Sequence, residues 1–180
     1  FIDSFYKERG YIDALCEIIS NKLQPRSDYL LFSYHGIPNR HLKKTDPTKN
    51  HCLQSKNCCD LQSKAKAYCY KAQVIETSKL CAENLRLKST EWGISFQSRI
   101  GPGWIEPFTD IELKKLADKG IKNLDVVCPS FVIDNLETLE EMNLRGRETF
   151  IKAGGESFNY IPCLNQSSLW LNYLEEVAKK

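Results

Sequence analysis

Short apolar runs alternate along the chain with longer stretches in which apolar residues recur at helical spacing. The helical pattern is clearest in residues 9–23, where apolar side chains repeat every three or four positions. Residues 29–34 (YLLFSY) instead form a continuous apolar run, which is typical of a strand buried on both faces. Similar patterns predict further strands at 92–97, 123–128 and 158–163, and helices at about 63–85, 109–119, 134–152 and 167–179.

This alternation of strands with helices of ten or more residues predicts βαβ units. The expected fold is α/β, with a parallel sheet of about four strands and helices on both faces. In such sheets, ligands bind beyond the carboxyl ends of the strands. Residues 34–36 follow the first strand and residues 129–141 follow the third, so we expect a functional site in these two segments.

His35 is the first candidate for chemistry, because it ends a buried strand beside a Gly-Ile-Pro turn. A neutral imidazole at this place can accept a proton or bind a metal ion. The alternative is a structural histidine whose ring is satisfied by a neighbouring backbone group.

An acidic stretch at residues 134–141 (DNLETLEE) is the second candidate. Glu137 and Glu141 are four residues apart, so they lie on one helical face, where a divalent cation or a shared proton would offset their repulsion. They could guide a metal ion, or one of them could act as a base. The structural alternative is a capping box formed by Asp134 and Glu137.

Four of the eight cysteines fall within 18 residues, at positions Cys52, Cys58, Cys59 and Cys69. Thiols in such a group can bind zinc or an iron–sulfur cluster. Their spacing matches neither the CxxC pairs of zinc ribbons nor the common ferredoxin motifs. The adjacent Cys58 and Cys59 suit a two-iron cluster better than a single tetrahedral ion. Reduced thiols without a ligand are the alternative.

Composition excludes several classes of protein. The 180 residues include 25 Lys and Arg against 23 Asp and Glu, and this near-neutral balance argues against a nucleic-acid partner. No apolar run approaches the ~18–20 residues of a membrane span, and no signal peptide opens the chain. We therefore expect a cytoplasmic protein.

The chain starts at Phe1 rather than at a methionine, as expected of a processed protein or of a segment of a longer one.

Six segments together carry a resemblance to a known family. They are residues 33–38 (SYHGIP), 96–101 (FQSRIG), 104–109 (WIEPFT), 127–131 (VCPSF), 134–141 (DNLETLEE) and 154–162 (GGESFNYIP). In this order, and over nearly the whole chain, they resemble the ferrochelatases, most closely those of bacterial type.

The resemblance implies a lyase that inserts ferrous iron into a porphyrin, either protoporphyrin IX or coproporphyrin, late in haem biosynthesis. The family fold has two flavodoxin-like domains with the porphyrin in the cleft between them. By this resemblance the chain is the C-terminal half. Residues 1–26 would form the crossover helix from a missing N-terminal domain, and residues 27–180 the chelatase domain. The chain alone is then an incomplete enzyme.

The resemblance also assigns roles to residues. His35 and Glu137 match the catalytic pair that contacts the substrate iron, and we favour His35 as the proton acceptor. Glu141 would continue the metal route. Tyr34 and Trp104, the latter in a Gly/Pro-rich loop suited to the lip of a pocket, would contact the porphyrin.

The chain departs from the family pattern at three places. Arg145 stands where many members continue the acidic row, and Asn135 stands where many have histidine. Residues 45–70 form an insertion, and some bacterial members bind a [2Fe-2S] cluster through cysteines at about this place, for which the four clustered cysteines are the candidates. Two other functions remain open: a chelatase for another metal such as cobalt, and a non-catalytic metal- or haem-binding module.

Overall fold

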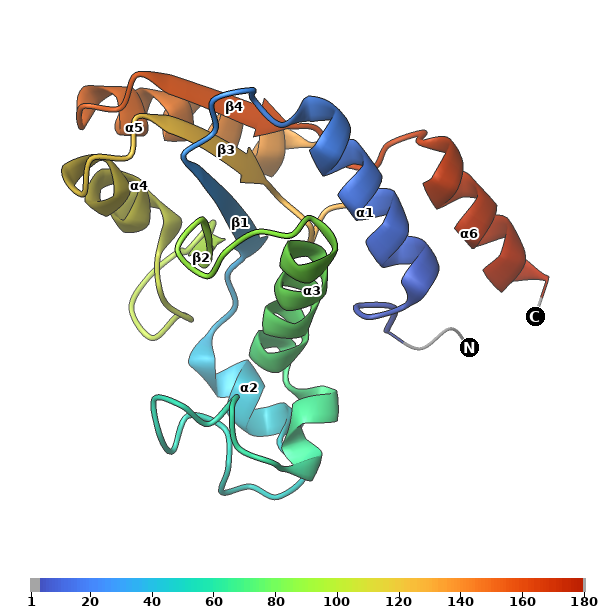
Figure 1. The fold of residues 1–180 in the computed structure, drawn as a ribbon. Helices are drawn as coiled ribbons and strands as arrows, with labels where there is room; N and C mark the ends of the chain where they lie inside the picture. The colour runs from blue at the N-terminus through green and yellow to red at the C-terminus, as the bar shows by residue number, and fades with distance from the viewer. Residues whose placement is uncertain (1–3, 180) are drawn as a thin grey trace.

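Four parallel strands form a single sheet in the order β2–β1–β3–β4 (Figure 1). The computed structural model describes residues 4–179. The strands are β1 (Tyr29–His35), β2 (Trp92–Gln97), β3 (Asn123–Val127) and β4 (Ser157–Ile161). The predicted α/β fold with a four-stranded parallel sheet is therefore confirmed.

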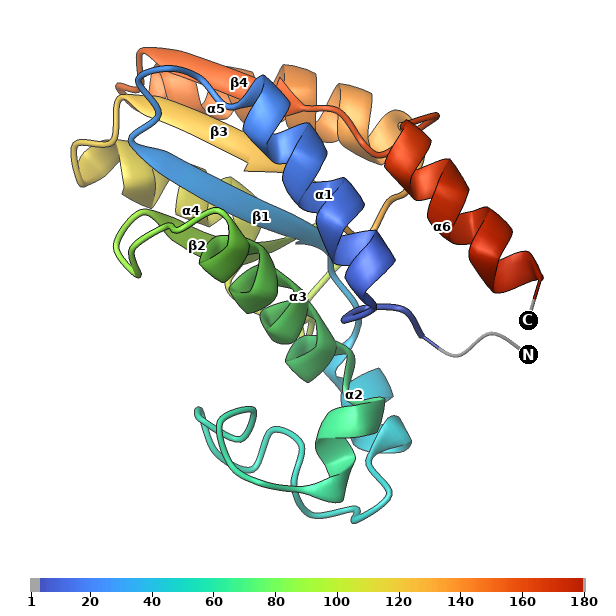
Figure 2. The same cartoon turned by 45° about the vertical axis from the view of Figure 1, so that its right-hand side comes forward.

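Helices cover both faces of this sheet (Figure 2). On one face lie α1 (Arg9–Lys22) and α3 (Tyr70–Asn84), with α6 (Ser168–Ala178) packed against α1. On the other lie α4 (Thr109–Asp118), the π-helix η2 (Glu137–Gly146) and α5 (Arg147–Lys152). Right-handed crossovers explain this division, because β1-to-β2 and β2-to-β3 run in opposite directions across the sheet.

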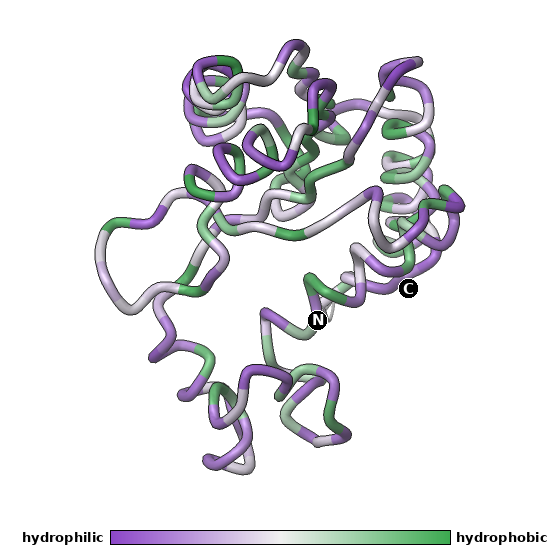
Figure 3. Tube along the Cα trace, turned by 60° about the vertical axis from the view of Figure 1, so that its left-hand side comes forward, coloured by the Kyte–Doolittle hydropathy of each residue, from purple (hydrophilic) through white to green (hydrophobic). Residues whose placement is uncertain are grey.

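Alternating residues of the strands supply the two cores. Phe32 and Val127 are buried under α1 and α3, whereas Leu31 and Val126 are buried under α4 and α5. The apolar runs are continuous because each central strand is buried on both faces. In Figure 3 many hydrophobic stretches accordingly lie in the interior of the trace, while its coiled segments alternate between hydrophobic and hydrophilic residues.

The segment between β1 and α3 is more ordered than its polar sequence predicts. It contains a short helix, α2 (Asn39–Thr45), and a 3-10 helix, η1 (Lys64–Tyr68). The single helix predicted at about 63–85 is wrong in its first turns, because Cys69 has an extended conformation and separates η1 from α3. In Figures 1 and 2 this segment projects from the body of the domain.

The helix predicted from Asp134 begins later, at η2. The proposed capping box of Asp134 and Glu137 is wrong, because the Asp134 carboxylate accepts hydrogen bonds from groups on the far side of the turn, including the Tyr160 hydroxyl. Asn135 and Thr138 form the reciprocal pair instead: each main-chain amide donates to the other's side chain. The wide turns of a π-helix occur frequently at functional sites.

The strand order reverses direction between β1 and β3. Such a switch point leaves a crevice beyond the carboxyl ends of the two strands, where ligands of open α/β sheets bind. His35 ends β1, and Ser130 follows β3 at the same place, so the fold concentrates candidate chemistry at this edge. No helix within residues 4–179 has the length and apolar character needed to cross a membrane.

Candidate active site

His35 is held at the switch point by main-chain bonds on two sides. Its amide donates to the Ser130 hydroxyl at 2.9 Å, and its carbonyl accepts from the Tyr70 hydroxyl at 2.9 Å. The half-buried ring places Nδ1 2.6 Å from the Gly36 carbonyl oxygen. Because a carbonyl can only accept, Nδ1 carries the proton, and Nε2 keeps a lone pair that can take up a proton or bind a metal ion.

Aromatic rings flank this imidazole. The Trp104 ring lies 6.4 Å from the His35 ring between centroids, and the Phe131 ring lies 6.0 Å away in an edge-on arrangement. The proximity of Trp104 depends on Gly36, where an added Cβ would lie 3.3 Å from the indole Cε3. The structure therefore brings His35 and Trp104 together, and the predicted contact of Trp104 with a porphyrin stays a prediction.

Trp104 also borders an open groove of about 580 Å³. Leu53, Lys56 and Lys71, from the inserted segment and the start of α3, line its other side. The Cys-containing insertion thus adjoins the Trp104 loop.

Glu137 is the first residue of η2 and is half-buried. Its carbonyl oxygen accepts a hydrogen bond from the Gln97 side chain at 2.8 Å. Its carboxylate has no hydrogen-bond partner within the described residues, so it is available to a ligand.

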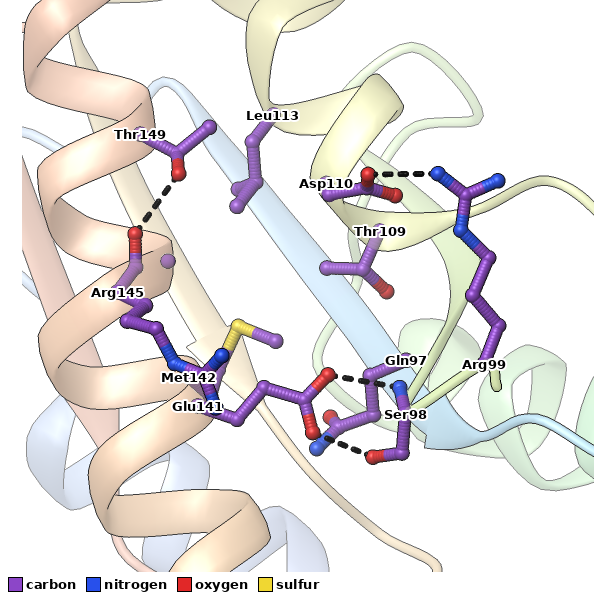
Figure 4. Close-up of a pocket in the computed structure, with 11 residues that line it drawn as sticks. Gln97, Ser98, Arg99, Thr109, Asp110, Leu113, Glu141, Met142, Arg145 and Thr149 are labelled. Atoms are coloured by element: carbon purple, nitrogen blue, oxygen red, sulfur yellow. Dashed lines mark hydrogen bonds and ion pairs between the residues drawn. The ribbon is translucent and has the colours of Figure 1, made fainter. Parts of the chain in front are cut away.

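Glu141 lies one turn further along η2 and has a different environment (Figure 4). One carboxylate oxygen accepts the Ser98 main-chain amide at 2.7 Å and the other accepts the Ser98 hydroxyl at 2.5 Å. Glu141 lines a cavity of about 310 Å³ together with Arg99, Asp110 and Arg145. Arg145, which also lines this cavity, is ion-paired with Glu140.

Tyr34 is not on the same side as these groups. It is buried under α3, its hydroxyl is 2.8 Å from the Ser78 hydroxyl, and burial raises its pKa well above the ordinary value. It lines a separate cavity of about 200 Å³ with Tyr11 and Tyr70. Its predicted contact with a porphyrin stays a prediction.

The four clustered cysteines converge. Three come from the loop between α2 and η1, and the fourth lies between η1 and α3. All four, Cys52, Cys58, Cys59 and Cys69, line with His51 one small cavity that has no space for a water molecule. The loop is ordered by Asp46, whose carboxylate accepts the amides of His51 and Cys52 at 2.9 and 2.8 Å. Within residues 4–179, no group of three or more His, Cys, Asp or Glu side chains is arranged so that it could hold a metal ion.

The electrostatics of this cavity favour one thiolate. A hydrogen bond from the Cys59 thiol, with others from the Ala72 amide, the Cys52 thiol and the Lys71 amide, lowers the pKa of Cys69 to about 6. Burial, with the charge of Cys69, raises the pKa of Cys52 to about 12. Cys thiolates are the usual ligands of iron–sulfur clusters, and hydrogen bonds to their sulfur atoms tune the reduction potential of such a group.

Sequence reasoning missed the polar residues that organise the site. Gln97 ends β2, is 2% exposed, and contacts both the first turn of η2 and the residue after His35. Ser98 donates a hydrogen bond to the Glu141 carboxylate. The main chain of His35 is hydrogen-bonded by the hydroxyls of Tyr70 and Ser130. The available signal was a glutamine at the buried end of an apolar strand, since buried polar groups need partners.

The chain is similar to known proteins over nearly its whole length. The model of the family described as "Ferrochelatase" matches residues 1–180. A ferrochelatase of Pseudomonas fluorescens (strain Pf0-1) is 45% identical over an alignment of 181 positions, which covers 99% of this chain and 53% of that protein. A ferrochelatase of Ectopseudomonas mendocina (strain ymp) is 46% identical over 98% of this chain and 52% of its own length.

The chain therefore spans about half the length of the curated relatives that it matches. The match to the family model extends over the whole chain, including the segments that carry His35 and Glu137. The chain belongs to the ferrochelatase family.

Proposed function

We propose that this chain is the C-terminal half of a ferrochelatase that inserts ferrous iron into a porphyrin in haem biosynthesis. The observation that supports it best is that Gln97 hydrogen-bonds both the residue after His35, whose imidazole has a free Nε2, and the carbonyl of Glu137, whose carboxylate has no partner among the described residues. Both come from segments that match the family model.

In the proposed reaction two pyrrole N–H protons leave the porphyrin, and Fe²⁺ replaces them without a change of oxidation state. His35 accepts the protons at Nε2, one at a time, and passes them to solvent. The bond from Nδ1 to the Gly36 carbonyl stabilises the imidazolium that forms. The Glu137 carboxylate exchanges with the water ligands of the ferrous ion and directs it to the ring nitrogens. The charge of Glu141 is satisfied by hydrogen bonds from Ser98, so this residue shapes the path of the ferrous ion rather than binding iron strongly.

We propose that Trp104 packs on the macrocycle beside His35 and that the rest of the polypeptide supplies the opposite wall of the cleft. The relatives contain about as much chain again, which is the room that a second domain needs. Residues 1–26 would then connect the two halves, and this half would be inactive alone.

We further propose that Cys52, Cys58, Cys59 and Cys69 bind a [2Fe-2S] cluster. Their convergence on one cavity and the low pKa of Cys69 support this assignment. Such a cluster supplies one-electron redox chemistry or local structural support, and the insertion step does not use it. We propose a cytoplasmic location for the enzyme, in keeping with its eight unpaired cysteines.

The test follows the loss of porphyrin fluorescence on anaerobic addition of Fe²⁺ to the complete polypeptide, with His35→Ala, Glu137→Gln and Glu140→Gln variants. Rapid metallation by the parent and by Glu140→Gln, with large losses in the other two, is expected. Glu140 is the matched control because its carboxylate lies on the same helix but is paired with Arg145.

A parent that binds porphyrin without metallating it would favour a binding module. Faster insertion of Co²⁺ than of Fe²⁺ would favour a cobalt chelatase. Activity that survives both site substitutions would overturn the choice of residues.

A further inference from the structure

Gln97 hydrogen-bonds three different parts of the chain near the site. Its side-chain Nε2 donates to the Glu137 carbonyl at 2.8 Å, and its Oε1 accepts from the Ser33 hydroxyl at 2.8 Å. The Cys128 thiol donates to the same Oε1 at 3.3 Å. The opposite amide orientation would set two carbonyl oxygens against each other, so these bonds fix which way the amide points.

The main chain of Gln97 makes the complementary contact. Its carbonyl oxygen accepts the Gly36 amide at 2.8 Å, directly after His35. A single buried residue at the end of β2 therefore holds both the end of β1 and the first turn of η2.

We propose that Gln97 is a positioning residue that sets the placement of Glu137 relative to His35. This inference rests on the proposed function, because it assigns these two residues to one reaction. Gln97 itself is 2% exposed and does not reach the substrate. It acts through the main chain of its two neighbours.

The placement of Glu137 depends on this contact because it ties the first residue of η2 to the end of β2. Ser98 anchors Glu141, one helical turn away, by the side chain. The Glu137 side chain has no such anchor in the described structure, so its place follows that of its main chain. A misplacement of about 1 Å in a reacting group can cost as much as ~10²-fold in rate, so the loss of this bond should be visible in kcat.

The experiment uses Gln97→Met in the complete polypeptide, since methionine has nearly the length of glutamine but no hydrogen-bonding amide. Anaerobic metallation gives kcat and the KM for porphyrin for this variant, for Glu137→Gln and for the double variant. Thr77→Val is the matched control: Thr77 is also 2% exposed and hydrogen-bonded, but its partners are the Tyr6 and Gln73 carbonyls. Gln97→Asn, one methylene shorter, serves if Gln97→Met does not fold.

We expect Gln97→Met to lower kcat ~10- to 100-fold with KM changed less than about twofold. In the Glu137→Gln background the same change should cost less than about threefold, because the group to be positioned is already lost. Thr77→Val should leave kcat unchanged. Additive losses in the double variant, or an unchanged kcat in a folded Gln97→Met, would overturn the proposal.

Amide hydrogen exchange separates this result from a failure of the proposed function. Gln97→Met should speed exchange in residues 137–142 but leave that of β3 unchanged. A parent that does not metallate porphyrin overturns the proposed function and with it the catalytic consequence. The exchange rates then still decide whether Gln97 holds the helix. Unchanged exchange in η2 would reject even that.

Discussion

Both oxygens of the Glu141 carboxylate accept hydrogen bonds from Ser98, one from its main-chain amide and one from its hydroxyl. Glu137, four residues earlier on the same helix, has a carboxylate with no such partner among the described residues. Two acids that look equivalent in the sequence therefore differ in their availability. The Glu137 carboxylate is unengaged within the described structure, whereas the Glu141 carboxylate joins η2 to the residue that follows β2.

This difference predicts unequal effects of the same substitution. Glu137→Gln should lower kcat for metallation by ~10² or more, which is typical of the loss of an acid–base or metal-exchanging group. Glu141→Gln should lower kcat by only about tenfold and also lower the melting temperature, because an amide opposite Ser98 can accept one of the two bonds but not both. Steady-state kinetics with thermal unfolding measure both. Equal losses of kcat at unchanged stability would show that Glu141 contacts the metal as directly as Glu137.

Gly36 is required by the close approach of two chain segments. An added Cβ would lie 2.9 Å from the Gln97 carbonyl oxygen and 3.3 Å from the Trp104 ring, and the first of these is main chain that cannot turn away. Gly36→Ala should therefore displace the end of β1 with His35 and lower kcat at least tenfold. Gly155→Ala, at the opposite end of the sheet, is the control for general destabilisation. A Gly36→Ala enzyme with parental kcat would show that the site tolerates this shift.

Asp28 ties the start of β1 to the start of β3 and gives the stability a defined pH dependence. Bonds from the Asn123 amide, the Lys122 amide and the Asn123 side chain outweigh burial and lower the pKa of this carboxyl. A carboxyl with a lowered folded-state pKa stabilises the fold above its unfolded-state pKa, and the contribution is lost as the pH falls through the folded-state value. Asp28→Asn should thus lower the melting temperature by a few degrees at pH 7. The difference in melting temperature between the parent and this variant should disappear below about pH 4.

Melting curves between pH 3 and 7 for Asp28→Asn and for Glu17→Gln provide the comparison. Glu17 is an exposed acid on α1 without a hydrogen bond in the described structure. A gap that persists unchanged at pH 3 would assign the effect to packing instead of charge.

Much of the fold could be predicted because the spacing of apolar residues in a segment matches the way in which that segment is buried. The apolar run of β1 and the helical spacing of α1 each follow from burial, and the alternation of elements predicts the parallel sheet. The switch point then placed His35 correctly, since connection rules leave few arrangements of such a sheet.

The features that could not be predicted depend on contacts between residues that are distant in the sequence. Asp134 was expected to cap the next helix, yet its carboxylate bonds across the turn to groups such as Asn165, 31 residues later. The π-helical geometry of η2 has no periodic signature over ten residues. The role of Gln97 could not be predicted because its three hydrogen-bond partners come from different parts of the chain.

Gly155 tests the packing of the core away from the site. An added Cβ there would lie 2.2–2.6 Å from atoms of the Phe150 ring, which is fully buried between α5 and β4. Gly155→Ala should lower the free energy of unfolding by ~1–3 kcal/mol through overpacking. Gly101→Ala is the matched control, since no atom lies within 4 Å of the added Cβ and the residue has no positive φ. Denaturant unfolding of both variants measures the difference, and equal stabilities would mean that the Phe150 ring moves aside freely.

The cysteine cavity predicts a bound cluster with a defined set of ligands. The complete polypeptide, purified without oxygen, should contain two irons and two acid-labile sulfides per chain in the ~1:1 ratio of a [2Fe-2S] cluster, with visible absorption that dithionite bleaches. Cys69→Ser should abolish the cluster, because Cys69 is the thiol most readily deprotonated in the cavity. Cys16→Ala, which removes a buried thiol of α1 outside the cavity, should retain it. Iron that stays bound in Cys69→Ser, or a parent with iron but no labile sulfide, would contradict the four-cysteine assignment and indicate a different metal site.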